Sequence, residues 1–157
     1  MIAIISPMKY YGYDDFKNDT LQLLGELKSF EPEVIVGIAR GGLTLAHALS
    51  EGFNIREVQT IRTELYDATC KRETLSIFGK CDFKEHNRVL VVDDIADSGE
   101  TLKAVMQNLE SEFPKIIFRS ATLFYKKTSV YKPHFWVNDA NEWIDFFWES
   151  DFKVKEL

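Results

Sequence analysis

Basic residues, cysteines and long apolar runs are scarce in this sequence of 157 residues. Lys and Arg number 19 against 25 Asp and Glu, and the net charge of -6 argues against a dominant nucleic-acid-binding surface. No apolar run reaches the roughly 20 residues that a membrane-spanning helix requires. The N-terminal apolar stretch is too short for a signal peptide and lacks a basic start. We therefore expect a cytoplasmic protein with no membrane span and no nucleic-acid partner.

Residue types that define common metal and nucleotide sites are present without the required spacing. The two cysteines, Cys70 and Cys81, form no C-x-x-C motif, so free thiols are expected. The three histidines, His47, His86 and His134, show no zinc-ligand spacing. The sequence contains neither the G-x-x-x-x-G-K-[ST] motif of P-loop proteins nor the Rossmann G-x-G-x-x-G motif.

What the sequence does contain is an alternation of apolar strands and amphipathic helices. Helices are expected at residues 13–30, 44–53 and 100–113, and strands at 33–38, 57–62, 88–94, 115–125 and 134–138. Without repeats or a linker, the whole chain, residues 1–157, is predicted to form one domain. Alternating strands and helices predict an α/β fold with a central, mostly parallel sheet that is flanked by helices.

Residues 63–87 form a polar segment without clear periodicity between two expected strands. A compact domain rarely carries so long a connection without a function. One interpretation is a pair of short strands in a hairpin that leaves the sheet, and another is a lid over a site. The two interpretations are compatible.

The stretch RVLVVDDIADSGET, residues 88–101, runs from the clearest strand into three acids, a glycine and a hydroxyl residue. Carboxylates this close repel one another, so solvent, a metal ion or a ligand rich in donors must compensate. The loops ARGG after residue 38 and KKT after residue 125 also follow expected strands. Ligands of parallel sheets bind beyond the carboxyl ends of the strands, so the three loops are expected to converge on one crevice.

The segment DSGET, residues 97–101, opens the helix that follows it. A glycine-bearing loop at a helix N-terminus binds phosphate through its amides and the helix dipole. The same residues also resemble a capping box between Asp97 and Glu100, and the segment alone does not decide between the two. Asp93 and Asp94 are better explained by a ligand with vicinal hydroxyls or by Mg²⁺. Together these features predict a sugar-phosphate site.

The stretch VLVVDDIADSGET resembles the signature of type I phosphoribosyltransferases, which bind 5-phosphoribosyl-1-pyrophosphate (PRPP). GIARGGL, residues 37–43, is similar to the pyrophosphate loop of that family, where the peptide bond at the Ala39–Arg40 position is often strained or cis. A tight turn with two glycines would leave Arg40 unexplained. The resemblance implies the type I phosphoribosyltransferase fold with a flexible hood loop.

Within this family, the segments YDATCKRETL, LFYKK and EWIDFFWE resemble the bacterial xanthine-guanine branch. The resemblance places Arg72 on the phosphate, Lys126 on the exocyclic oxygen of a 6-oxopurine, and Trp143 and Ile144 on the purine ring. Taken alone, the C-terminal aromatic residues are more typical of a core or an interface. Two departures, Leu65 in place of a serine and Lys127 in place of a proline, leave hood closure and base preference open.

The resemblance also implies the remaining roles. Asp94 is expected to reach Mg²⁺, and Asp97 to accept the purine proton as catalytic base. The residues expected to bind PRPP are Arg40, Gly41, Arg72, Asp93, Asp94, Asp97, Ser98, Gly99, Glu100 and Thr101.

The implied reaction is transfer of phosphoribose from PRPP to a 6-oxopurine, with Mg²⁺ as cofactor, in purine salvage. The sequence does not rank xanthine, guanine and hypoxanthine. The alternative is a regulatory protein of the same fold that senses PRPP or nucleotides without catalysis. The resemblance also implies a homodimer or homotetramer, because members of the family commonly form such oligomers.

Overall fold

The computed structural model describes residues 7–67 and 73–154, without side chains between residues 65 and 74. Arg72, Cys70 and the Leu65 side chain therefore lie outside the described part of the chain. In chain order the elements are β1 (Met8–Tyr11), α1 (Tyr13–Leu27), β2 (Val34–Ala39), α2 (Leu43–Phe53), β3 (Val58–Asp67), β4 (Glu73–Phe78), β5 (Arg88–Val92), β6 (Ile95–Ala96), α3 (Glu100–Glu112), β7 (Ile117–Tyr125), β8 (Phe135–Asp139), β9 (Trp143–Phe146) and α4 (Phe147–Ser150).

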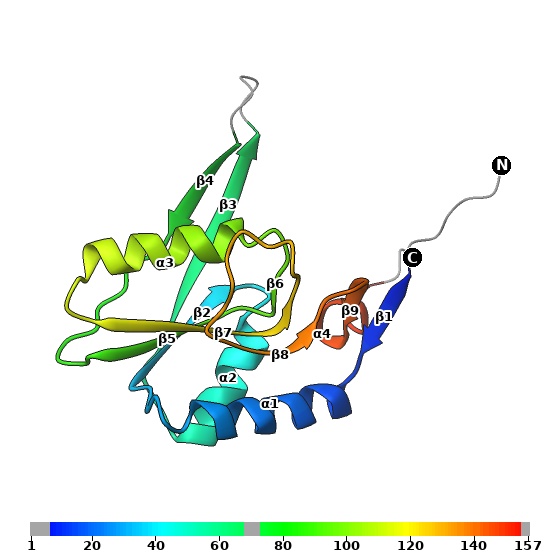
Figure 1. Cartoon of the computed structure of the whole chain (residues 1–157), viewed down its shortest axis with the longest axis horizontal. Helices are drawn as coiled ribbons and strands as arrows, with labels where there is room; N and C mark the ends of the chain where they lie inside the picture. The colour runs from blue at the N-terminus through cyan, green and yellow to red at the C-terminus, as the bar shows by residue number, and fades with distance from the viewer. Residues whose placement is uncertain (1–6, 68–72, 155–157) are drawn as a thin grey trace.

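A seven-stranded sheet forms the centre of the molecule, with strand order β4-β3-β2-β5-β7-β6 and β8 also paired with β7. Every neighbouring pair is parallel except β3 with β4. Helix α3 covers one face, and α1 and α2 cover the other (Figure 1). The predicted α/β fold with a mostly parallel, helix-flanked sheet is therefore confirmed.

The central strands are buried on both faces, which explains their continuous β-branched runs. Along β5, Leu90 and Val92 pack into the core under α1 and α2, whereas Val89 and Val91 pack under α3. The alternation follows from the two-residue side-chain period of a strand. Both cores therefore fix the position of β5, the strand that ends at the acidic stretch.

The helices follow their predicted apolar faces. Helix α3 buries Leu102, Val105, Met106 and Leu109, at the helical spacing seen in the sequence. Helix α1 ends at Leu27, three residues before the predicted end, and residues 28–30 form a turn. Helix boundaries are the least certain part of any pattern-based prediction.

The polar segment 63–87 contains the predicted hairpin. Strand β3 continues to Asp67 and pairs antiparallel with β4. The hairpin projects beyond the ends of the other strands (Figure 1). The hairpin interpretation is confirmed, and the lid interpretation stays a prediction.

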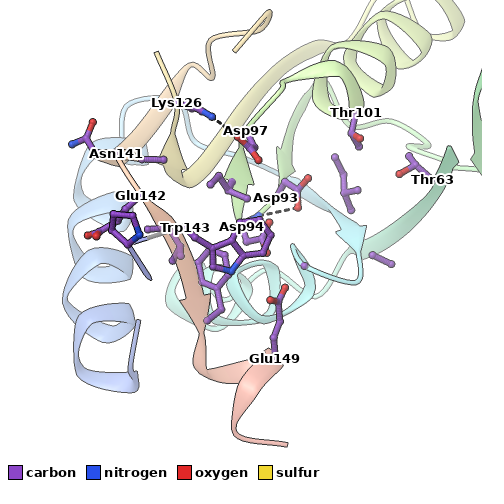
Figure 2. Close-up of a pocket in the computed structure, with 18 residues that line it drawn as sticks. Thr63, Asp93, Asp94, Asp97, Thr101, Lys126, Asn141, Glu142, Trp143 and Glu149 are labelled. Carbon is purple, nitrogen blue, oxygen red and sulfur yellow. Dashed lines mark hydrogen bonds and ion pairs between the residues drawn. The ribbon is translucent and has the colours of Figure 1, made fainter. Parts of the chain in front are cut away.

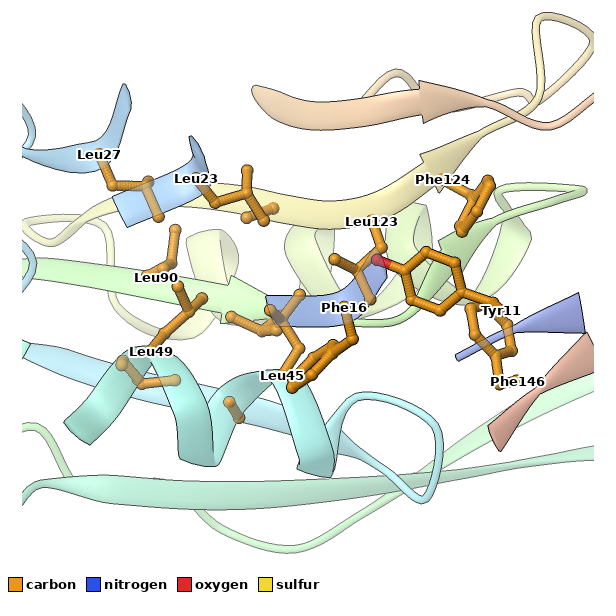
Figure 3. Close-up of a cluster of buried hydrophobic side chains, with 14 of the residues drawn as sticks. Tyr11, Phe16, Leu23, Leu27, Leu45, Leu49, Leu90, Leu123, Phe124 and Phe146 are labelled. Carbon is orange, nitrogen blue, oxygen red and sulfur yellow. The ribbon is translucent and has the colours of Figure 1, made fainter. Parts of the chain in front are cut away.

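A second, two-stranded sheet pairs β1 with β9 in parallel, so that Met8 lies opposite Trp143. The sequence pattern did not predict this pairing. Tyr11 joins the small sheet to the main core, where its ring packs edge-on against Phe124 and Phe146 (Figure 3). The Tyr11 hydroxyl donates to Asp19 Oδ2 at 2.7 Å. These contacts hold β9, and with it the C-terminal aromatic segment, beside the end of the main sheet.

No helix within residues 7–67 or 73–154 has the length and apolar character needed to cross a membrane. Cys81 is a free, half-buried thiol, as expected.

Candidate active site

A cavity of about 660 Å³ opens where the carboxyl ends of β2 and β5 meet β9. Five of the residues expected to bind PRPP line it: Gly41, Asp93, Asp94, Asp97 and Thr101. The four residues expected to meet the purine line it as well: Asp97, which belongs to both sets, Lys126, Trp143 and Ile144. Figure 2 shows Asp93, Lys126 and Trp143 reaching the cavity from separate parts of the chain. The predicted convergence of the strand-end loops is therefore present.

A smaller cavity of about 200 Å³ lies against residues 97–101, which we call the phosphate loop. Ser98, Gly99 and Thr101 line it. Gly99 has φ of 82°, a left-handed conformation that favours glycine, and it is the N-cap of α3. The loop therefore presents a small hollow at a helix N-terminus, a geometry suited to an anion.

The capping-box interpretation of the phosphate loop is wrong. Gly99, and not Asp97, stands at the N-cap position, and no side chain caps the helix there. Instead, the Glu100 amide donates to Ser98 Oγ at 3.3 Å. Glu100 itself is exposed and lines neither cavity.

Asp93 and Asp94 are desolvated at the floor of the site. Asp94 is only 7% exposed, and its amide donates to Asp93 Oδ1 at 2.9 Å. Burial, followed by the charge of Asp94, raises the pKa of Asp93 well above its usual range. Burial, with the charge of Glu149 adding to it, also raises the pKa of Asp94. The two acids therefore lie close together in a desolvated position, where positive charge or further donors from a ligand would favour their charged forms.

The loop after β2 packs directly on this acid pair. A Cβ on Gly41 would lie 2.7 Å from Asp94 Cγ, and one on Gly42 would lie 2.9 Å from Asp93 Cα, so neither position has room for a side chain. The Ala39–Arg40 peptide bond is cis, as the resemblance implied. Arg40 is exposed and lines neither cavity.

The purine end of the site pairs a lysine with an acid. Lys126 Nζ lies 3.6 Å from Asp97 Oδ1, and both side chains are half-exposed (Figure 2). Trp143 is 65% exposed at the rim, whereas Ile144 is buried beneath it. The Trp143 amide donates to the Pro7 carbonyl at 3.2 Å, so the β1–β9 pairing sets the position of the rim.

A family model described as "Phosphoribosyl transferase domain" matches residues 19–156 of this chain. The chain belongs to the phosphoribosyltransferase family. Helicobacter pylori xanthine-guanine-hypoxanthine phosphoribosyltransferase superposes with a TM-score of 0.86 at 40% identity, over 92% of this chain and 96% of that chain. A purine phosphoribosyltransferase from Pyrococcus horikoshii superposes with a TM-score of 0.81 at 29% identity, over 96% and 98% of the two chains.

Among curated relatives, xanthine-guanine phosphoribosyltransferase of Idiomarina loihiensis is 32% identical over 118 residues, which are 73% of this chain and 70% of that protein. The relative of that name in Cereibacter sphaeroides is 27% identical over 161 residues, covering 94% and 90%. The similarity to the xanthine-guanine branch is therefore confirmed.

The cavity of this phosphoribosyltransferase also includes residues that the sequence reasoning missed, among them Thr63, Asn141, Glu142 and Glu149. Glu149 ends the EWIDFFWE segment, so the segment was noted but its acid was not. Thr63 lies within β3, opposite Ile77 of β4, and lines the cavity from there. Glu142 begins the EWIDFFWE segment and was likewise not assigned to the site, whereas Asn141 carries no local pattern that marks it as a cavity residue.

Proposed function

We propose that this phosphoribosyltransferase transfers the phosphoribosyl group of PRPP to a 6-oxopurine in purine salvage. The C1–oxygen bond to pyrophosphate breaks, a bond forms between C1 and N9 (or N7) of the purine, and the nitrogen loses its proton. The observation that carries the proposal is the meeting of a desolvated acid pair, a phosphate loop and a Lys–Asp pair around one cavity. The products are pyrophosphate and a nucleoside monophosphate.

At the PRPP end, Asp93 and Asp94 accept hydrogen bonds from the ribose hydroxyls. The phosphate loop holds the 5′-phosphate by its amides and by Ser98 and Thr101. Arg40 and the Gly41 backbone meet the leaving pyrophosphate, and Arg72, outside the described residues, is assigned to the same group by resemblance alone.

The acid pair fits Mg²⁺. Its oxygens are the hard ligands that this ion prefers, and neither carboxylate has a salt bridge to a side chain of residues 7–64 or 75–154. Asp94 would hold the ion directly or through water. When bound, Mg²⁺ supplies positive charge that favours departure of pyrophosphate.

At the purine end, Lys126 donates to the O6 atom and Trp143 packs on the ring. Asp97, 3.6 Å from Lys126 Nζ, accepts the ring proton as the nitrogen attacks. The transition state resembles an oxocarbenium ion, so positioning and charge supply most of the acceleration. Closure of residues 63–87 would exclude water, which otherwise hydrolyses the activated sugar.

The regulatory alternative gains no support from the relatives found. Homodimer or homotetramer formation and a cytoplasmic location stay predictions.

A spectrophotometric assay with PRPP, Mg²⁺ and xanthine, guanine or hypoxanthine in turn tests the proposal. Formation of a monophosphate with at least one purine, and its loss when Mg²⁺ is omitted, is the expected result. A folded protein that converts none of the three purines would exclude the proposed reaction.

A further inference from the structure

The turn of residues 126–131, which connects β7 to β8, packs directly on the phosphate loop. The Lys126 amide donates to the Ala96 carbonyl at 3.0 Å, and the Val130 amide donates to the Ser98 carbonyl at 2.8 Å. A Cβ on Gly99 would lie 2.8 Å from the Tyr131 nitrogen. The turn therefore contacts the chain at Ala96, Ser98 and Gly99, just before α3 begins.

These two hydrogen bonds determine where two loop amides point. In a planar trans peptide the C=O and the following N–H point in opposite directions. Because the Ala96 and Ser98 carbonyls face the turn, the amides of Asp97 and Gly99 face away from it. Asp97 and Gly99 both line the smaller cavity on the phosphate loop.

Ser129 makes three hydrogen bonds within the turn. Its Oγ donates to the Tyr131 carbonyl at 2.7 Å and accepts from the Tyr131 amide at 3.2 Å, while its own amide donates to the Lys126 carbonyl at 2.9 Å. A Cβ on Gly99 would collide with Ser129 Oγ, so this hydroxyl fills the space beside the glycine.

The far end of the turn is fixed to the main sheet. The Tyr131 hydroxyl lies 3.3 Å from Oγ of Ser120, which is fully buried in β7. His134 Nδ1 accepts the Ser120 amide at 3.0 Å. The turn therefore stands on a rigid strand, which is what a support for a precise binding loop requires.

We propose that Ser129 is a positioning residue for the 5′-phosphate of PRPP. By holding the turn in shape, it keeps the Val130 amide on the Ser98 carbonyl and so directs the Gly99 amide at the phosphate. The inference rests on the proposed function, since it takes the phosphate loop as the site of that group.

Steady-state kinetics of Ser129→Ala test the inference. Losing the Ser129 hydrogen bonds should raise the PRPP KM roughly fivefold. The purine KM and kcat should stay within about twofold of the parent values, because Lys126 and Asp97 are unchanged. Calorimetry with ribose 5-phosphate as the probe should show the same weakening as the PRPP KM.

Two further variants separate positioning from a general loss of structure. Ser129→Thr keeps the hydroxyl and should restore PRPP binding, whereas Thr128→Ala, an exposed change in the same turn, should leave it unaltered. If Ser129→Ala is too unstable to assay, Ser129→Cys offers a weaker donor of similar size for the same comparison.

An active parent enzyme with unchanged PRPP KM and ribose 5-phosphate affinity in Ser129→Ala would overturn the inference, as would an effect on the purine KM alone. A parent protein that makes no monophosphate from any purine would instead overturn the proposed function.

Discussion

At the scale of single residues, Asp97 is the group on which the proposed proton transfer depends. Asp97→Asn keeps the size of the side chain and removes its ability to take a proton. Turnover should fall by about 10²- to 10⁴-fold, the usual contribution of a positioned base. The measurement is kcat at saturating PRPP and purine, with the exposed Asp139→Asn as the matched control. Unchanged turnover in Asp97→Asn would remove the assignment.

Lys126 is the residue whose side chain and backbone serve different ends of the site. Lys126→Ala removes the proposed donor to O6 but keeps the amide that binds the Ala96 carbonyl. The purine KM should therefore rise about tenfold while the PRPP KM stays unchanged. Lys127→Ala, next to it and exposed, should leave both constants alone. A loss confined to PRPP would contradict the role given to Lys126.

At the scale of elements, the sequence predicted the helices and strands whose apolar periodicity is strong, and it did not predict pairings between distant parts of the chain. Strand β5 and helix α3 have strong periodicity, so their buried residues followed from the sequence. The strand was predicted to reach residue 94, whereas β5 ends at Val92 and the short strand β6 follows it. The β1–β9 pairing did not follow from the sequence, because two four-residue strands from opposite ends of the chain carry no local sign of their partner. The arrival of Glu149 at the cavity depends on that pairing and was missed with it.

Glu33 links the start of β2 to the start of β5 and so helps to hold the strand that carries the acid pair. Its Oε1 accepts the amides of Asn87 and Arg88 at 3.0 Å each. The Asn87 amide is the largest cause that lowers the pKa of Glu33 below its usual value. The stabilisation is therefore present above the unfolded-state pKa and is lost as the pH falls through the folded-state pKa.

Glu33→Gln should lower the free energy of unfolding by about 1 kcal/mol at pH 7. The difference from the parent should shrink as the pH falls below the ordinary Glu value of about 4.3, and it should vanish once the pH is below the lowered folded-state pKa, where the parent carboxyl is neutral as well. Urea denaturation between pH 3 and pH 7 measures both effects. Glu31→Gln, an exposed neighbour, is the control, and a difference independent of pH would show that the charge of Glu33 is not the cause.

At the scale of the whole molecule, packing of the two hydrophobic cores holds the strand ends together, although this places acids close to one another and lowers the stability of the free protein. The cavity concentrates acids where β5 ends, with Asp94 buried, and the only cation among its described lining residues is Lys126, which lies near Asp97. Sites built for charged ligands commonly lower the stability of the free protein in this way. A substitution that neutralises the acid pair is therefore expected to raise the free energy of unfolding and to weaken ligand binding.

Asp94→Asn tests that opposition. Because the folded-state pKa of Asp94 is raised, its contribution to stability falls as the pH rises from the ordinary Asp value of about 4 through the folded-state value. Replacing it with the neutral amide should raise the free energy of unfolding by about 1–3 kcal/mol at pH 8 and by less at pH 5. Asp97→Asn, at a half-exposed side chain, should change stability much less. Thermal melts with and without PRPP and Mg²⁺ should show the ligands stabilising the parent but not Asp94→Asn. An Asp94→Asn protein less stable than the parent at pH 8 would show that the acid pair is compensated within the free molecule.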